Sequence, residues 1–338
     1  MSYEANATIE QWLAQEEVEG VLEPELAIVD PHHHLWDIRT ATTQPHRSFQ
    51  QKVYLCEDIA LEIERSGHNV VQTVFAQCGA FYRASGPEEL KCVGETEFVH
   101  GVVAMSNSGI YGNADLCAGI FGSADLRVGS AVKGVLQAHL NASDNFRGVR
   151  TAFPSDLNDQ FLDGYAELSK LRLSYDNYSP DFERLPTLAK LADKNTDTTV
   201  IVNHLGGNID ANADPETVKR WQAGIDAIAA SPNAVMKCGG AQMRSGKWEP
   251  EFHMNKRQNP IGSEELCETL FPYYEYAINA FGPDRCMFES NFPVDRECIS
   301  YRTLWNAFKR IADRLGLSET EKAAIFSGTA RRAYQLAE

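Results

Sequence analysis

The chain has 338 residues, of which 43% are hydrophobic and 23% charged, a composition typical of a globular protein. Asp and Glu number 47 against 31 Lys and Arg, so a formal net charge of −16 disfavours nucleic acid and anionic membranes as partners. No apolar run approaches the ~18 residues of a membrane span and the acidic N-terminus lacks the features of a secretory signal, so we expect a cytoplasmic protein.

Short β-branched runs alternate with longer helical patterns along the chain, which is the signature of βαβ units and a parallel sheet. Eight repeats of this kind suit an α/β fold of the closed (β/α)8 TIM-barrel type. The predicted strands are residues 26–34, 69–77, 117–126, 146–153, 171–178, 198–207, 233–240 and 285–292.

Helical periodicity predicts the segments that connect these strands. Ser263 is a candidate N-cap for a helix that follows it, and Ser318 with Glu321 forms a capping-box pattern near the end of the chain. The other predicted helices cover residues 88–105, 128–140, 159–170, 181–193 and 215–230.

A doubly wound open sheet is the rival topology, but no GxGxxG motif opens a helix after the first strand. No linker divides the chain, so we expect one barrel domain over residues 26–338, preceded by an N-terminal extension of residues 1–25. Residues 241–262 form a long irregular connection after the seventh strand, on the face where barrel enzymes keep their chemistry. We interpret this connection as a candidate lid.

The eight cysteines show no CxxC pair, and several lie within apolar runs. This pattern favours reduced thiols that are mostly buried over a disulfide framework or a cysteine metal site.

Three adjacent histidines follow the first apolar run, in the stretch VDPHHHLWD. Because strand side chains alternate between faces, His32 and His34 point one way and His33 the other. His204 closes the sixth predicted strand, and the carboxyl ends of barrel strands share one mouth. An isolated HxH pair could be two hydrogen-bonded core imidazoles, but three histidines at this rim predict a shared site for a divalent metal, zinc above all.

The eighth predicted strand supplies the carboxylates, in the stretch FESNFPVD. Glu289 could ligate the metal or act as general base, with a buried ion pair as the alternative. Asn291 lies on the same face and can orient a group but cannot take a proton. Asp295 is either a helix N-cap or a second candidate for proton transfer.

Arg150 on the fourth strand is the candidate anchor for a small anionic substrate, because guanidinium matches a carboxylate bidentately. Tyr175 could donate to the substrate, although a core role is equally consistent with its position. Asp176 could bind metal or fix a histidine tautomer. Trp36 and Lys237 are weaker candidates. An aromatic side chain such as Trp36 usually packs against a site without taking part in it.

Taken in this order, the motifs resemble the amidohydrolases of the amidohydrolase-2 type, which are metal-dependent TIM-barrel hydrolases. This group includes lactonases of carboxylated lactones, such as 2-pyrone-4,6-dicarboxylate lactonase, and sugar lactonases. The similarity spans roughly residues 26–336, and its matching segments are VDPHHHLWD, FRGVR, NHLGG, MKCGG and CMFESNFPVD.

The resemblance implies that His32, His34 and His204 face the metal or the reacting carbonyl. Most of the superfamily has an aspartate general base where this chain has Asn291, which leaves Glu289 or Asp295 as substitutes. Some lactonases of this group work without metal, so the resemblance leaves both a zinc enzyme and a metal-free one open.

We therefore expect a hydrolase that opens a carboxylated lactone or related cyclic ester by attack of an activated water. A non-oxidative decarboxylase of the same family is the first alternative, and it would release CO₂ without incorporating water. A catalytically silent ligand-binding barrel is the second, because Asn291 removes the usual base. The sequence also leaves a homo-oligomer open.

Overall fold

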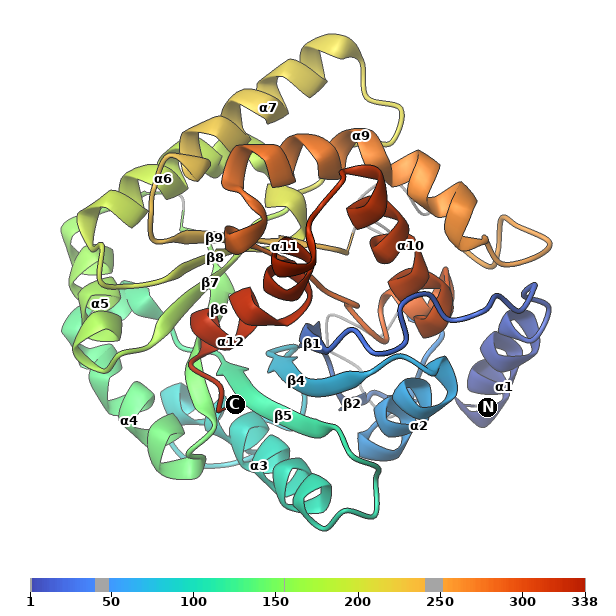
Figure 1. The fold of residues 1–338 in the computed structure, drawn as a ribbon. Coiled ribbons are helices and arrows are strands. Elements are labelled where there is room, and N and C mark those ends of the chain that lie inside the picture. Colours follow the sequence, from blue (N-terminus) through green and yellow to red (C-terminus); the bar gives the residue numbers. More distant parts are fainter. Residues whose placement is uncertain (1, 40–48, 155, 241–251, 338) are drawn as a thin grey trace.

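The computed structural model describes residues 2–39, 49–154, 156–240 and 252–337. Eight parallel strands form one sheet that curls into a barrel, with helices around its outside (Figure 1). This confirms the predicted (β/α)8 TIM barrel. In their spatial order the strands are β1 (Ile28–His33), β4 (Val70–Ala76), β5 (Asp115–Gly122), β6 (Phe146–Ala152), β7 (Ser174–Tyr178), β8 (Val200–Val202), β9 (Ala234–Cys238) and β10 (Cys286–Phe288).

The barrel closes where β1 meets the chain at the end of β10. His33 forms a parallel bridge with Phe292, just past the last strand. The Asp30 carboxyl reinforces this junction, because it accepts hydrogen bonds from the Ser290 backbone N–H at 3.0 Å, the Ser290 hydroxyl at 2.6 Å and the Tyr301 hydroxyl at 2.9 Å. Burial raises the pKa of Asp30 to about 6. A side chain of the first strand is therefore bonded directly to the segment after the last.

The helices around the barrel bury one apolar face each against the sheet. The prediction for residues 159–170 matches α5 at both ends. Helix α3 begins five residues later than predicted, because residues 88–90 form a 3-10 turn instead. The surrounding helices are α2 (Cys56–Ser66), α3 (Val93–Asn107), α4 (Lys133–Ala142), α5 (Asp159–Lys170), α6 (Leu185–Lys194), α7 (Pro215–Ala229), α9 (Ser263–Phe281) and α10 (Tyr301–Arg314).

One end of the barrel is covered by the C-terminal helices α11 (Glu319–Ala323) and α12 (Thr329–Tyr334) (Figure 1). The predicted capping box of Ser318 and Glu321 is confirmed at the start of α11. The Tyr334 ring is fully buried and meets the Phe121 ring edge to face, with centroids 5.1 Å apart. The candidate site lies at the opposite end, where the carboxyl ends of the parallel strands meet.

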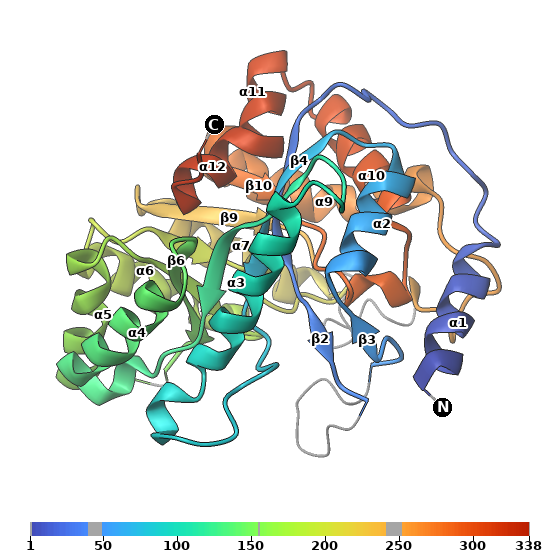
Figure 2. The same cartoon turned by 90° about the horizontal axis from the view of Figure 1, so that it is seen from below.

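Helix α1 (Ser2–Leu13) lies within the predicted N-terminal extension and packs beside α2 and α10 (Figure 2 shows it near these helices). Two buried cations tie residues 1–25 to the barrel. Arg296 donates to Glu10 and to Glu62, and Lys309 donates to the carbonyls of Leu22 and Glu23 at 2.6 and 2.9 Å. A short antiparallel pair, β2 (Trp36–Asp37) and β3 (Val53–Tyr54), was also absent from the sequence prediction.

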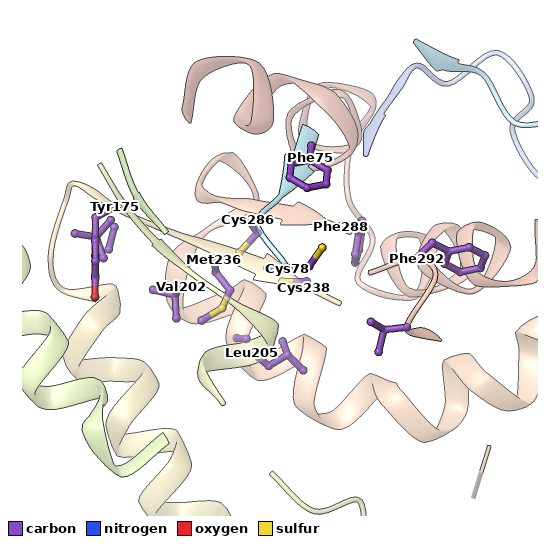
Figure 3. Packing of buried hydrophobic residues seen from close by; sticks show 14 of the residues in the cluster. Phe75, Cys78, Tyr175, Val202, Leu205, Met236, Cys238, Cys286, Phe288 and Phe292 are labelled. Atoms are coloured by element: carbon purple, nitrogen blue, oxygen red, sulfur yellow. The ribbon is translucent and has the colours of Figure 1, made fainter. Parts of the chain in front are cut away.

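The hydrophobic core lies between the sheet and its helices, and Figure 3 shows part of it around Phe75, Met236 and Phe288. All eight cysteines are free and buried, which confirms the predicted burial. Among the described residues, no helix combines the length and apolar character that crossing a bilayer requires.

The predicted lid falls partly outside the described residues, since 241–251 are not among them. The rest of that connection contacts the body of the protein. Phe252 and Ile261 are buried in the core, and His253 Nε2 lies 2.9 Å from a carboxylate oxygen of Glu297. Its role as a lid stays a prediction.

Gly164 on α5 offers a test of the packing between α5 and the turn at residues 126–132. A Cβ at this position would lie 2.1 Å from the Leu126 carbonyl oxygen. We expect Gly164→Ala to lower the free energy of unfolding by about 1–3 kcal/mol, because overpacking forces backbone apart. Gly101→Ala on α3, where nothing lies within 4 Å, should raise it by about 0.5–1 kcal/mol through helix propensity. Urea unfolding followed by circular dichroism compares the two, and stabilisation by both variants would contradict the packing argument.

Candidate active site

Three imidazoles meet at the carboxyl end of the barrel. The His32 ring lies 4.8 Å from the His34 ring and 4.8 Å from the His204 ring, measured between centroids. His33 points to the other face of β1, where its Nε2 is 2.9 Å from the Thr73 hydroxyl. Strand alternation thus separates His33 from the other two, as the sequence predicted, and the structure brings His32, His34 and His204 together.

Glu289 lies behind two of these rings and bridges them. Its Oε1 is 2.7 Å from His204 Nδ1, and its Oε2 is 2.9 Å from His32 Nδ1. The carboxylate is fully buried, as is His32, while His204 is 8% exposed. The contact with His204 is a hydrogen bond, and a carboxylate that accepts from Nδ1 of a histidine fixes the ring and leaves Nε2 available as a ligand.

Two glycines at the end of β9 make room for this contact. A Cβ at Gly239 would lie 2.2 Å from Cγ of Glu289, and a Cβ at Gly240 would lie 2.1 Å from Nδ1 of His204. His204 itself has φ of 50°, a left-handed conformation that is costly for a residue with a side chain. The MKCGG motif therefore provides the space in which the imidazole meets the carboxylate.

The protonation of the neighbouring rings follows from their partners. His34 Nδ1 is 2.7 Å from the Ala76 carbonyl, which can only accept, so Nδ1 carries the proton and Nε2 is the acceptor nitrogen of this ring. That Nε2 lies 3.2 Å from Nε2 of His32. Burial, followed by the nearby charge of Lys237, lowers the pKa of His32 well below its ordinary value, so this imidazole is neutral.

This donor set fits a divalent metal. One ligand atom each from His32, His204 and Glu289 lies within 4.8 Å of the others, and His204 Nε2 is buried without a hydrogen-bond partner among the described residues. Two nitrogens bound to zinc at ~2.05 Å in a tetrahedral arrangement lie about 3.3 Å apart, close to the separation of the His32 and His34 Nε2 atoms. Neutral imidazoles with a carboxylate are ligands typical of zinc.

Asn291 and Asp295 form a second buried group next to Glu289. The Asn291 amide donates to Oδ1 of Asp295 at 2.9 Å, and Oδ2 of Asp295 has no hydrogen-bond partner among the described residues. Burial raises the pKa of Asp295 well above its ordinary value, and the charge of Glu289 adds to the rise. The helix N-cap interpretation of Asp295 is wrong, because Ser300 caps α10.

Arg150 reaches toward the cluster from β6. Its Nη1 donates to the Gln77 carbonyl at 2.7 Å, its Nε is 3.7 Å from Asp176, and its guanidinium lies 4.5 Å above the Tyr178 ring. The side chain is 9% exposed, and Nε makes no hydrogen bond within the described part of the chain.

The other two predicted substrate contacts are placed differently. Tyr175 points outward into the hydrophobic layer, where its ring meets Tyr165 edge to face at 5.6 Å, and Figure 3 shows it among buried apolar side chains. The structure does not bring it to the site, because alternation along β7 places Asp176 inside. Trp36 is fully buried behind His34, with the two rings near parallel and 6.0 Å apart, and donates to the Gln51 carbonyl.

Asp176 and Lys237 are more central than the sequence suggested. Lys237 Nζ lies 2.7 Å from Asp176 Oδ2 and 3.0 Å from His32 Nδ1, and both side chains are almost completely buried. Alternation along β7 and β9 could place each side chain on the inward face, but it could not show that the two meet.

With this geometry established, comparison with known proteins decides the family. The chain matches the family model described as Amidohydrolase over residues 29–336. It belongs to that amidohydrolase family. The uncharacterized protein y4mH of Sinorhizobium fredii is 30% identical to it, over 92% of this chain and 99% of the relative.

Two further proteins are similar to this chain. The L-fucono-1,5-lactonase of Burkholderia multivorans is 29% identical over 160 residues, which cover 46% of this chain and 50% of the lactonase. A crystal structure of an amidohydrolase from Burkholderia multivorans with bound zinc superposes with a TM-score of 0.71 at 21% identity, covering 92% of this chain and all of the other. At that identity the likeness shows a shared fold.

The loop that follows β4 offers a pH-dependent test beside the site. Glu95 on α3 is fully buried and accepts from the backbone N–H groups of Cys78 and Ala80 at 3.1 and 2.9 Å, next to the Gln77 carbonyl that holds Arg150. Burial raises the pKa of Glu95 to about 7. The folded state therefore binds more protons than the unfolded state between about pH 4.5 and 7, and this contribution to stability is lost as pH rises.

We expect Glu95→Gln, whose side chain stays neutral, to remove this decrease in stability with rising pH. The free energy of unfolding of the wild type relative to the variant should fall by about 1 kcal/mol per pH unit from pH 4.5 to 7. Guanidinium unfolding at several pH values gives the free energy of unfolding of both proteins. The contributions of the other titrating groups cancel when one value is subtracted from the other. A difference that stays constant with pH would show that Glu95 titrates at its ordinary pKa.

Proposed function

We propose that this protein is a metal-assisted lactonase, a hydrolase that uses water to open a cyclic ester. The buried cluster of His32, His204 and Glu289 at the carboxyl end of the barrel carries the proposal, because barrel enzymes keep their chemistry there. Membership of the amidohydrolase family and the partial match to L-fucono-1,5-lactonase support the choice of reaction.

We infer that the Nε2 atoms of His32, His34 and His204 hold one divalent ion, zinc by preference. Glu289 would then accept the Nδ1 hydrogens of His32 and His204 from behind. The zinc in the Burkholderia multivorans structure of the same fold supports this identity. When bound, such an ion polarises a carbonyl and makes water more acidic.

Asp295 is the residue of this chain best suited to move the proton. Each oxygen of Glu289 lies within 2.9 Å of an imidazole nitrogen, although Oε2 makes no hydrogen bond among the described residues. Asp295 meets the Asn291 amide through Oδ1, its Oδ2 also makes no hydrogen bond in that part of the chain, and burial raises its pKa. Asp295 takes a proton from water as the water oxygen adds to the lactone carbonyl. It returns that proton to the ring oxygen when the carbon–oxygen bond breaks, and a hydroxy acid results. Asn291 holds Asp295 in place through its amide.

Arg150 selects the substrate in this proposal. Its guanidinium is held in position by Gln77, Tyr178 and Asp176, and the exposed part of this group would meet a carboxylate of the substrate. The favoured substrates are therefore small lactones that carry a carboxylate.

Lactone turnover tests the function. We expect acid release, followed with a pH indicator, from carboxylated lactones, with one atom of oxygen from labelled water in the product. Asp295→Asn should lower kcat about 10²–10⁴-fold, the usual contribution of a proton-transfer residue. Arg150→Gln should raise KM for carboxylated lactones and leave neutral sugar lactones unaffected.

Other outcomes of this assay would exclude the proposed reaction. Release of CO₂ without incorporation of water would identify a decarboxylase. Tight binding of dicarboxylates without turnover would identify a ligand-binding barrel.

Metal content separates the proposed ligands from the residue behind them. We expect His204→Asn to lose bound zinc and Glu289→Gln to weaken zinc affinity about 10–100-fold, as changes outside the ligand set do. Elemental analysis and chelator competition give the two values. His100→Asn, which changes an exposed histidine on α3, is the control and should retain zinc. Equal losses in the Glu289 and His204 variants would make Glu289 a ligand.

A further inference from the structure

The ammonium group of Lys237 is surrounded by acceptors inside the barrel. Nζ lies 2.7 Å from Asp176 Oδ2, 3.3 Å from Asn203 Oδ1 and 3.0 Å from His32 Nδ1, so each of its three hydrogens has a partner. Oε2 of Glu289 is 4.0 Å away. Lys237 is only 1% exposed, and Asp176 and Glu289 are fully buried. The charge of these two carboxylates is therefore balanced by one lysine and not by solvent.

The contact with His32 opposes metal binding at that ring. When Nδ1 of His32 accepts from Lys237, the single proton of the neutral imidazole is on Nε2, directed at Nε2 of His34. A metal on Nε2 of His32 requires the other tautomer, in which the proton is on Nδ1 and the Oε2 atom of Glu289, 2.9 Å away, is the nearby carboxylate oxygen. That tautomer gives up the hydrogen bond from Lys237. The positive charge of Lys237 also repels a cation held by the adjacent rings.

We propose that Lys237 is a built-in counter-cation of this site. It balances Asp176 and Glu289 when no metal is bound, keeps the metal-free protein folded, and weakens the affinity of the three histidines for a divalent ion. Lys237 is thus a positioning residue that sets metal affinity through His32. This inference rests on the metal site of the proposed function, but not on the identity of the substrate.

Removal of the charge tests the idea through binding and thermal stability, without substrate. We expect Lys237→Gln and Lys237→Met to bind Zn²⁺ at least tenfold more tightly than the wild type in competition with a chromophoric chelator. Their Tm in EDTA should fall, and the rise in Tm from EDTA to Zn²⁺ should exceed that of the wild type. The glutamine variant can still donate to Asp176, which also keeps Arg150 nearby, so it serves if the methionine variant fails to fold.

Lys309→Met is the matched control. Lys309 is also a buried lysine that donates to a histidine, with Nζ 2.9 Å from His68 Nδ1, but it lies outside the site. The decrease in Tm of this variant relative to the wild type should be the same in EDTA and in Zn²⁺, and its zinc affinity should equal that of the wild type.

The remaining outcomes decide between the two proposals. Unchanged or weaker zinc affinity in the Lys237 variants, or no zinc binding by any form, overturns the role of Lys237. Tighter zinc binding in these variants, with no lactone turned over by the wild type, supports this role and refutes the lactonase.

Discussion

The junction between the first strand and the segment after the last one determines the rest of this structure. Asp30 joins them through a buried carboxyl that accepts from two backbone N–H groups, those of His32 and Ser290, and from the hydroxyls of Ser290 and Tyr301. A buried carboxyl with so many donors is satisfied where an unpaired one would be costly. The same junction places Glu289 beside His32, so the contacts that close the barrel also bring these two site residues together.

The candidate site concentrates features that cost stability. Asp176, Glu289 and Asp295 are fully buried carboxyl groups, and Lys237 is a nearly buried amine. His204 and Asn291 also have left-handed backbones, with φ of 50° and 56°. Strain and buried charge of this kind persist where the surrounding structure enforces them, and they cluster at functional sites. Here the enforcing elements are the carboxyl ends of the strands together with the short segments that follow them, such as the 3-10 turns at His204–Gly206 and Asp295–Glu297.

Much of the fold could be predicted because its signals are periodic. Eight apolar runs gave the barrel, and alternation placed His32 and His34 on one face with His33 on the other. The pair formed by Asp176 and Lys237 could not be found in this way, because it depends on the register of β7, β8 and β9 across the barrel interior. Tyr175 was misplaced for a related reason, since one position along a strand reverses the direction of a side chain. The two-residue strands β2 and β3 are too short to show any period.

The origin of the clustered side chains has a consequence for how the protein acquires its site. His32 comes from the first barrel strand, Glu289 from the end of the last, and His204 from between them. Contacts between such distant parts of a chain form late in folding, because the entropy of closing a long loop is lost before the contacts contribute free energy. A divalent ion would therefore meet the histidines, with Glu289 behind them, only in a nearly native barrel. It would stabilise the folded protein and would not direct the early steps of folding.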